Sequence, residues 1–185
     1  MILDKSDVRG PLFGEIDERF ARDDEWSFPK SISIGWPVQT TDVATFRDYS
    51  TRYYRASQSI CAMIKNNDVE DYVVSFPVIY LVRHSIELGL KGAILSQTGK
   101  APFGHELNKL WPRVQGLSDW ALNWIREFHD LDTKSDALRY PDSNVTSFEV
   151  GALLDDWETK TEKLHGHLMM LCQDQQTIGN TQHAK

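Results

Sequence analysis

Residues 78–95 read VIYLVRHSIELGLKGAIL, and this stretch decides the fold. Its apolar side chains fall on nearly every face of a helix, a pattern typical of a buried central helix. Pro77 precedes the stretch, so the helix either runs from about 72 to 97 with a bend or begins near Phe76. Gly99 and Pro102 end it. A helix this apolar must be covered by others, so we expect a helical bundle around it.

Helices are also predicted on both sides of this stretch. Apolar residues recur at helical spacing after an N-cap at Thr41 or Asp42, and the polar residues 66–68 break that helix. Further along, Thr146 and Glu149 have the spacing of a capping box for the last helix. The predicted helices span about 41–65, 72–97, 105–114, 118–131 and 146–171.

These predictions describe an all-α protein, an up-and-down bundle of four to five helices joined by short loops. The bundle takes up residues 41–175. Residues 1–40 contain several prolines, glycines and acidic runs, and are expected to form an irregular N-terminal arm. Residues 176–185 are polar and are expected to form a frayed tail.

Composition and charge argue against several classes of function and site. The 185 residues suit one domain, and the formal net charge of −7 disfavours broad binding to duplex DNA, which needs positive charge. Cys61 and Cys172 fall at apolar helical positions and are expected to be reduced core thiols. Neither zinc motif, Cys-x-x-Cys or His-Glu-x-x-His, occurs. Acidic residues follow the first residues, and the longest apolar run, 72–82, is too short for a bilayer, so we expect a cytoplasmic protein without membrane contact.

A polar stripe crosses the central helix. Arg83, Glu87 and Lys91 are spaced four residues apart and therefore share one face, with His84 beside them. Charges on so apolar a helix are costly unless they pair with one another or face a wet cavity. One interpretation is a structural ladder in which Glu87 bridges Arg83 and Lys91; the other is a functional site.

Two further segments favour a site. His105 lies in Gly-His-Glu-Leu at 104–107, and Arg139 begins Arg-Tyr-Pro at 139–141. We expect Arg83, Glu87, His105 and Arg139 to converge in space. The other histidines have ordinary explanations, and His165 and His167 in particular are expected to face solvent.

Together the segments resemble the HEPN domain. That family carries Glu-x-x-x-Lys followed by a small residue, as at 87–92, then a His-x-Leu turn, as at 105–107, and commonly Arg-Tyr-Pro before its last helix. The resemblance implies a helical bundle, frequent homodimers, and roles in toxin–antitoxin, phage-defence and RNA-processing systems. The aromatic residues Tyr53, Tyr54, Trp120 and Trp124 are candidates for a dimer surface.

Catalytic members of this family are metal-independent endoribonucleases with an Arg followed by His after four to six residues. This chain departs from that motif, because positions 144–146 hold Asn, Val and Thr. If it cuts RNA, Arg139, His84 and His105 are the catalytic candidates, the histidines moving protons and the arginine neutralising phosphate charge. Arg83, Glu87 and Lys91 would complete the binding site, and Tyr140 could stack a base.

Three hypotheses therefore stay open. The first is an effector of toxin–antitoxin or phage-defence type that acts on RNA or a nucleotide without metal or cofactor. The second is a non-catalytic HEPN-like module that pairs with a nucleotidyltransferase-type antitoxin or another defence protein. The third is a structural bundle with an internal salt-bridge ladder.

Overall fold

The computed structural model of the chain describes residues 41–135, 138 and 152–173. The chain divides into two units, Met1–Gln39 and Thr40–Lys185, and all described residues belong to the second. Within them lie five α-helices, one 3-10 turn and no strand, so the predicted all-α class is confirmed. The helices are α1 (Val43–Lys65), α2 (Asp71–Thr98), α3 (Leu107–Leu110, followed by the 3-10 turn Trp111–Arg113), α4 (Asp119–Leu131) and α5 (Leu154–Leu171).

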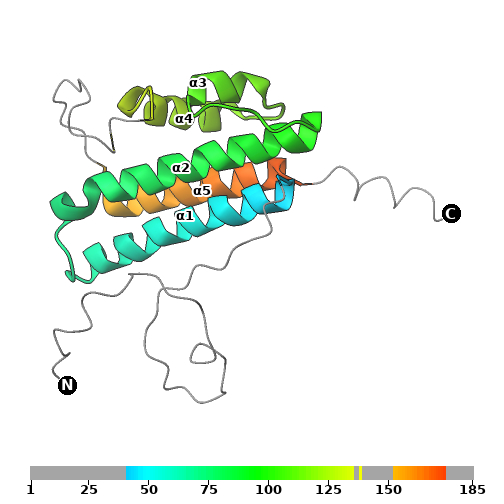
Figure 1. The fold of residues 1–185 in the computed structure, drawn as a ribbon. Coiled ribbons are helices and arrows are strands. Elements are labelled where there is room, and N and C mark those ends of the chain that lie inside the picture. The colour runs from blue at the N-terminus through cyan, green and yellow to red at the C-terminus, as the bar shows by residue number, and fades with distance from the viewer. Residues whose placement is uncertain (1–40, 136–137, 139–151, 174–185) are drawn as a thin grey trace, which may run out of the picture. The chain divides into compact units, whose positions relative to one another are not determined.

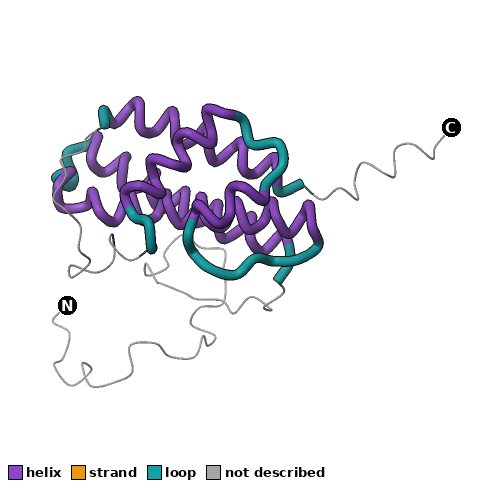
Figure 2. Tube along the Cα trace, turned by 90° about the horizontal axis from the view of Figure 1, so that it is seen from above, coloured by secondary structure: helices purple, strands orange, loops and turns teal. Residues whose placement is uncertain are grey.

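Helix α2 is the centre of the bundle. Figure 1 shows α1 and α5 on one side of it and α3 and α4 on the other, and Figure 2 shows the same helices from above. Direct packing of α2 against α1, α5 and α3 agrees with this view. Leu90, Ala93 and Ile94 are fully buried, as predicted for a helix that is apolar nearly all round.

Two glycines let α5 approach α2 closely. A Cβ atom at Gly89 would lie 3.1 Å from Cβ of Leu168, and one at Gly92 would lie 2.9 Å from Sγ of Cys172. The Cys172 thiol occupies this space and donates to the carbonyl oxygen of Gly89 at 3.1 Å. Both Cys61 and Cys172 are buried free thiols, as predicted.

The predicted ends of the first two helices are confirmed. Asp42 caps α1 by accepting from the backbone amide of Thr45 at 2.7 Å. Asn67, with a φ of 58°, lies in the turn that follows. Gly99 ends α2 in the left-handed region, with a φ of 71° that costs glycine little.

Pro77 lies inside α2, which begins six residues earlier at Asp71; a start near Phe76 was therefore the wrong alternative. Proline has no amide hydrogen, so the carbonyl of Val73 cannot receive its helical bond from residue 77. The exposed position of Val73 and Phe76 lets water satisfy that carbonyl instead.

Two predicted helices are shorter than expected. The segment 105–114 is helical only from Leu107, and it tightens to a 3-10 turn at Trp111 because Pro112 has no amide to donate to Asn108. Helix α5 begins at Leu154, so a capping box at Thr146 and Glu149, which lie outside the described residues, does not start it. Leu153, which precedes the first residue of α5, is 80% exposed.

Among the described helices, α2 alone is long and apolar enough to cross a membrane by length and composition, a test that the core helix of a soluble bundle also passes. The expectation from the sequence rested on the apolar run 72–82, which contains Ser75 and Pro77, whereas the helix extends much further. Its middle holds three buried charged side chains, Arg83, Glu87 and Lys91.

Candidate functional site around Glu87

The carboxylate of Glu87 is the centre of a buried charge cluster. Its Oε1 lies 2.8 Å from Nζ of Lys91 and 2.8 Å from Nδ1 of His105. Its Oε2 lies 3.7 Å from Nη1 of Arg83 and 3.8 Å from Nδ1 of His84. Glu87 itself is only 1% exposed, so these basic groups replace the water that a surface carboxylate would keep.

The cluster keeps Glu87 ionised. Burial by itself would raise the pKa of this carboxyl group, because the interior disfavours the charged form. Interactions with His84, Lys91 and His105 outweigh burial and lower the pKa to about 2. Glu87 is therefore an anion at neutral pH, and it can only accept hydrogen bonds.

Arg83 joins the central helix to the end of α4. Its Nη1 donates to Oγ of Ser135 at 2.8 Å, and its Nη2 donates to the backbone carbonyls of Asp132 at 3.1 Å and His105 at 3.2 Å. Its Nε lies 3.5 Å from Oδ2 of Asp132. Arg83, Asp132 and Ser135 are all buried, so the guanidinium group is used inside the protein.

His105 is the accessible member of the cluster. Its side chain is 64% exposed, although its Nδ1 is held by the buried Glu87. Because the ionised carboxylate can only accept, Nδ1 carries the hydrogen in that bond. A neutral His105 therefore presents Nε2 as a hydrogen-bond and proton acceptor, with its orientation set from behind by the carboxylate.

His84 lies on the other oxygen of Glu87 and within an aromatic group. Its ring is parallel to that of Tyr80, with 5.7 Å between the centroids, and the edge-on ring of Tyr53 lies at 4.4 Å. The side chain of His84 is 21% exposed. Two imidazoles therefore share one buried carboxylate, one of them open to solvent and the other largely enclosed by tyrosines.

A family model for the HEPN domain matches residues 49–163, well over half of the chain. The chain belongs to the HEPN domain family. The match spans all five described α-helices in whole or in part and includes every residue of the Glu87 cluster. No curated protein and no solved structure shows significant similarity to the chain.

Within this HEPN domain, the predicted convergence is partly visible. Arg83, His84, Glu87 and His105 meet at one site, together with Lys91. Arg139 and Tyr140 lie outside the described residues, so their part of the prediction stays untested.

Asp132 and Ser135 hold Arg83, and neither was predicted as a site residue. A signal for them exists, because a buried arginine requires acceptors from a neighbouring element. Asp132 and Ser135 lie one and four residues after Leu131, the last residue of the fourth predicted helix. The chain has other acidic segments, and only the packing of α4 against the rest of the bundle shows that this one supplies the acceptors for Arg83.

His165 was expected to face solvent, and that prediction was wrong. Its ring stacks on Tyr54 at 4.3 Å, and its Nδ1 lies 3.4 Å from Oγ of Ser85. Burial, with a smaller effect of the Arg55 charge, lowers the pKa of His165 to about 4. His167 is also partly buried, with its Nε2 3.4 Å from the backbone amide of Ser118. Both rings are covered because α5 has neighbours on two sides.

Proposed function

We propose that this HEPN protein acts on RNA or a nucleotide in a prokaryotic toxin–antitoxin or phage-defence system, in the cytoplasm. The supporting observation is the Glu87–His105 pair, an exposed imidazole whose Nδ1 is held 2.8 Å from a buried carboxylate. An imidazole oriented in this way is suited to taking a proton from a substrate hydroxyl group.

The chemistry that suits this pair is metal-independent RNA cleavage. The ribose 2′-oxygen attacks the adjacent phosphorus while its proton passes to Nε2 of His105, and the bond from phosphorus to the 5′-oxygen breaks. The leaving 5′-oxygen takes a proton from a second acid, for which His84 is the candidate because it shares Glu87. The products are a cyclic phosphate and a 5′-hydroxyl. Arg139, which is a candidate from the family resemblance alone, would neutralise phosphate charge in this proposal.

Lys91 and Arg83 have a different role in this proposal from the one that the sequence suggested. Arg83 is fully buried and Lys91 is 8% exposed, and each is bonded within the protein. They would hold Glu87 and the loop of His105 in place instead of contacting phosphate. Both are positioning residues for the Glu87–His105 pair.

A second candidate function is a non-catalytic HEPN module that binds a nucleotidyltransferase-type antitoxin or another defence protein. The burial of Arg83 favours the non-catalytic module. Among the described residues of the site, no exposed guanidinium group lies beside His105 to bind a phosphate. The absence of His from positions 144–146 favours it as well.

Incubation of the purified protein with mixed RNA in excess chelator distinguishes the nuclease from the non-catalytic module. The nuclease proposal expects cleavage to cyclic phosphate ends and a loss of about a hundredfold or more in His105→Ala, the usual worth of a general acid or base. Arg139→Ala should also abolish cleavage. Phe103→Ala is the matched control, because Phe103 lies in the same loop and is 98% exposed. Intact RNA, with binding of a nucleotide or partner that Arg139→Ala abolishes, would support the non-catalytic module.

A further inference from the structure

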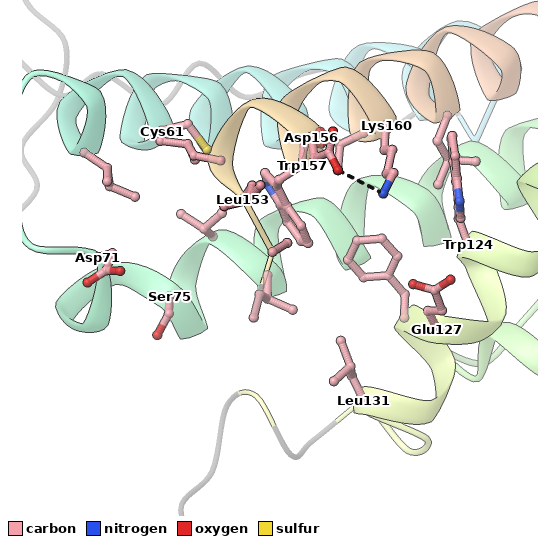
Figure 3. A pocket seen from close by; sticks show the side chains of 18 of the residues that line it. Cys61, Asp71, Ser75, Trp124, Glu127, Leu131, Leu153, Asp156, Trp157 and Lys160 are labelled. Carbon is pink, nitrogen blue, oxygen red and sulfur yellow. Dashed lines mark hydrogen bonds and ion pairs between the residues drawn. The ribbon is translucent and has the colours of Figure 1, made fainter. Parts of the chain in front are cut away.

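A second surface lies away from the Glu87 cluster, in a groove of about 850 Å³ between the beginning of α2, the end of α4 and the first turns of α5. Figure 3 shows Trp157 and Leu153 facing Leu131 across it. The volume lies within the range of about 300–1,000 Å³ that is common for ligand sites in proteins. The floor is apolar and aromatic, and its large side chains include Ile79, Trp124, Phe128, Leu131, Trp157 and Leu164.

Apolar side chains continue from the floor onto the surface. Tyr72 and Leu153 line the groove and are 72% and 80% exposed, and Phe76, in the same first turns of α2 as Tyr72, is 60% exposed. Large apolar side chains exposed beside an apolar groove are uncommon on a surface that stays in water and indicate a contact with another molecule.

The rim of the groove is strongly acidic. Among the described residues that line the groove, Asp71, Glu127, Asp130 and Asp156 are all exposed, against one cation, Lys160. Lys160 is itself paired with Asp156, with Nζ 3.6 Å from Oδ2 (Figure 3). The rim therefore carries an excess of negative charge around an apolar floor.

We infer that this groove docks a cationic amphipathic segment of a partner protein. Apolar side chains of the segment would cover the aromatic floor, and its Lys or Arg side chains would pair with the four carboxylates of the rim. This inference does not rest on the proposed function, because no residue of the Glu87 cluster lines the groove.

Charge complementarity also decides against other occupants. A second copy of the chain docked by the same face would bring an identical acidic rim against this one, at a net charge of −7 for each chain. RNA or DNA would place phosphates against carboxylates, which repel them. A basic, partly apolar polypeptide meets neither obstacle.

The test uses the full chain and two labelled synthetic peptides of about 15 residues, long enough for four helical turns. One has Leu and Lys at amphipathic spacing, and the other has Glu in place of every Lys. We expect the Lys peptide to bind and the Glu peptide not to bind in fluorescence anisotropy. Raising NaCl from about 50 mM to about 500 mM should weaken the binding, because the pairs on the rim are exposed.

Variants locate the binding in the groove. Glu127→Lys with Asp130→Lys should weaken it about tenfold or more, and Leu153→Ser should weaken it at either salt concentration. Glu162→Lys is the matched charge control, since Glu162 is exposed on α5 but does not line the groove. Its affinity should stay within about twofold of the parent, and circular dichroism should show that every variant folds.

Equal binding of the two peptides, or an equal loss in Glu162→Lys and the groove variants, would overturn the inference. So would self-association, measured by sedimentation, that disappears in Leu153→Ser, since the occupant would then be a second copy. His105→Ala should leave peptide binding unchanged, so a failure of the RNA proposal and a failure of the groove proposal give different results.

Discussion

At the scale of single residues, Glu87 matters most because two buried cations, Arg83 and Lys91, share its carboxylate. Removing its charge leaves Lys91 and Arg83 inside the protein without their shared partner. Breaking a buried ion pair in this way commonly costs about 3–5 kcal/mol, much more than an exposed pair contributes.

We therefore predict that Glu87→Gln lowers the free energy of unfolding by about 3 kcal/mol or more. Urea unfolding followed by circular dichroism measures the change. Glu106→Gln is the control, because Glu106 pairs with the exposed Lys109 and should cost about 1 kcal/mol or less. Similar losses in the two variants would mean that the Glu87 cluster contributes little to stability.

The lowered pKa of His165 predicts that the stability of the fold depends on pH. Its folded-state pKa is lowered from 6.5 to about 4, so the unfolded chain binds a proton before the folded chain does. The stability that depends on neutral His165 is present above pH 6.5 and is lost as the pH falls toward 4. Solvent screening at this partly buried ring keeps the effect on the order of 1–2 kcal/mol. The corresponding loss for Glu87 comes at lower pH, between 4.5 and about 2.

His165→Phe keeps an aromatic ring against Tyr54 and removes the titration. We expect its free energy of unfolding to change less than that of the parent between about pH 7.5 and about pH 4.5. Unfolding in urea at the two pH values checks this. A parent and variant that lose the same stability would assign the acid sensitivity to other groups.

At the scale of elements, the contact between α2 and α5 depends on small residues. Gly92→Ala would place a Cβ atom 2.9 Å from Sγ of Cys172 and 3.1 Å from Cβ of Phe46, so both neighbours of α2 would have to shift. Crowding of this kind in a packed core commonly costs about 1–3 kcal/mol.

Gly166→Ala gives the opposite expectation. Gly166 lies on the exposed side of α5, and a Cβ atom there meets nothing within 4 Å. Alanine should stabilise that helix by about 0.5–1 kcal/mol. Thermal unfolding of the two variants compares them directly, and a Gly92→Ala protein as stable as Gly166→Ala would show that α2 and α5 pack less tightly than described.

At the scale of the whole molecule, the homodimer remains a prediction from family membership. The aromatic residues suggested for its surface support it weakly, because Tyr54 is 6% exposed and the other three are partly buried within the bundle. A dimer would also avoid the acidic groove, so its contact must lie elsewhere. We expect light scattering of the purified chain to give twice the chain mass of 21.3 kDa, also in Leu153→Ser. A monomer at high concentration would contradict the dimer.

The sequence by itself determined which segments become helices and which helix is central. Helical spacing, the Asp42 cap and the Gly99 stop act over one or two turns, so they can be read without knowing the fold. It also predicted that Arg83, Glu87 and His105 converge, because charges on so apolar a helix need partners. Arg139, the fourth residue of that prediction, lies outside the described residues.

Only the tertiary structure decided what each of those charges can reach. Whether Arg83 meets a ligand or the end of α4 depends on where Asp132 and Ser135 lie, and neither is near Arg83 in sequence. The same holds for His165, whose ring stacks on Tyr54 of α1 and whose Nδ1 lies 3.4 Å from Oγ of Ser85 on α2. Helical propensity is local, whereas electrostatic pairing and desolvation depend on distance in space, and the packing of helices around α2 sets those distances.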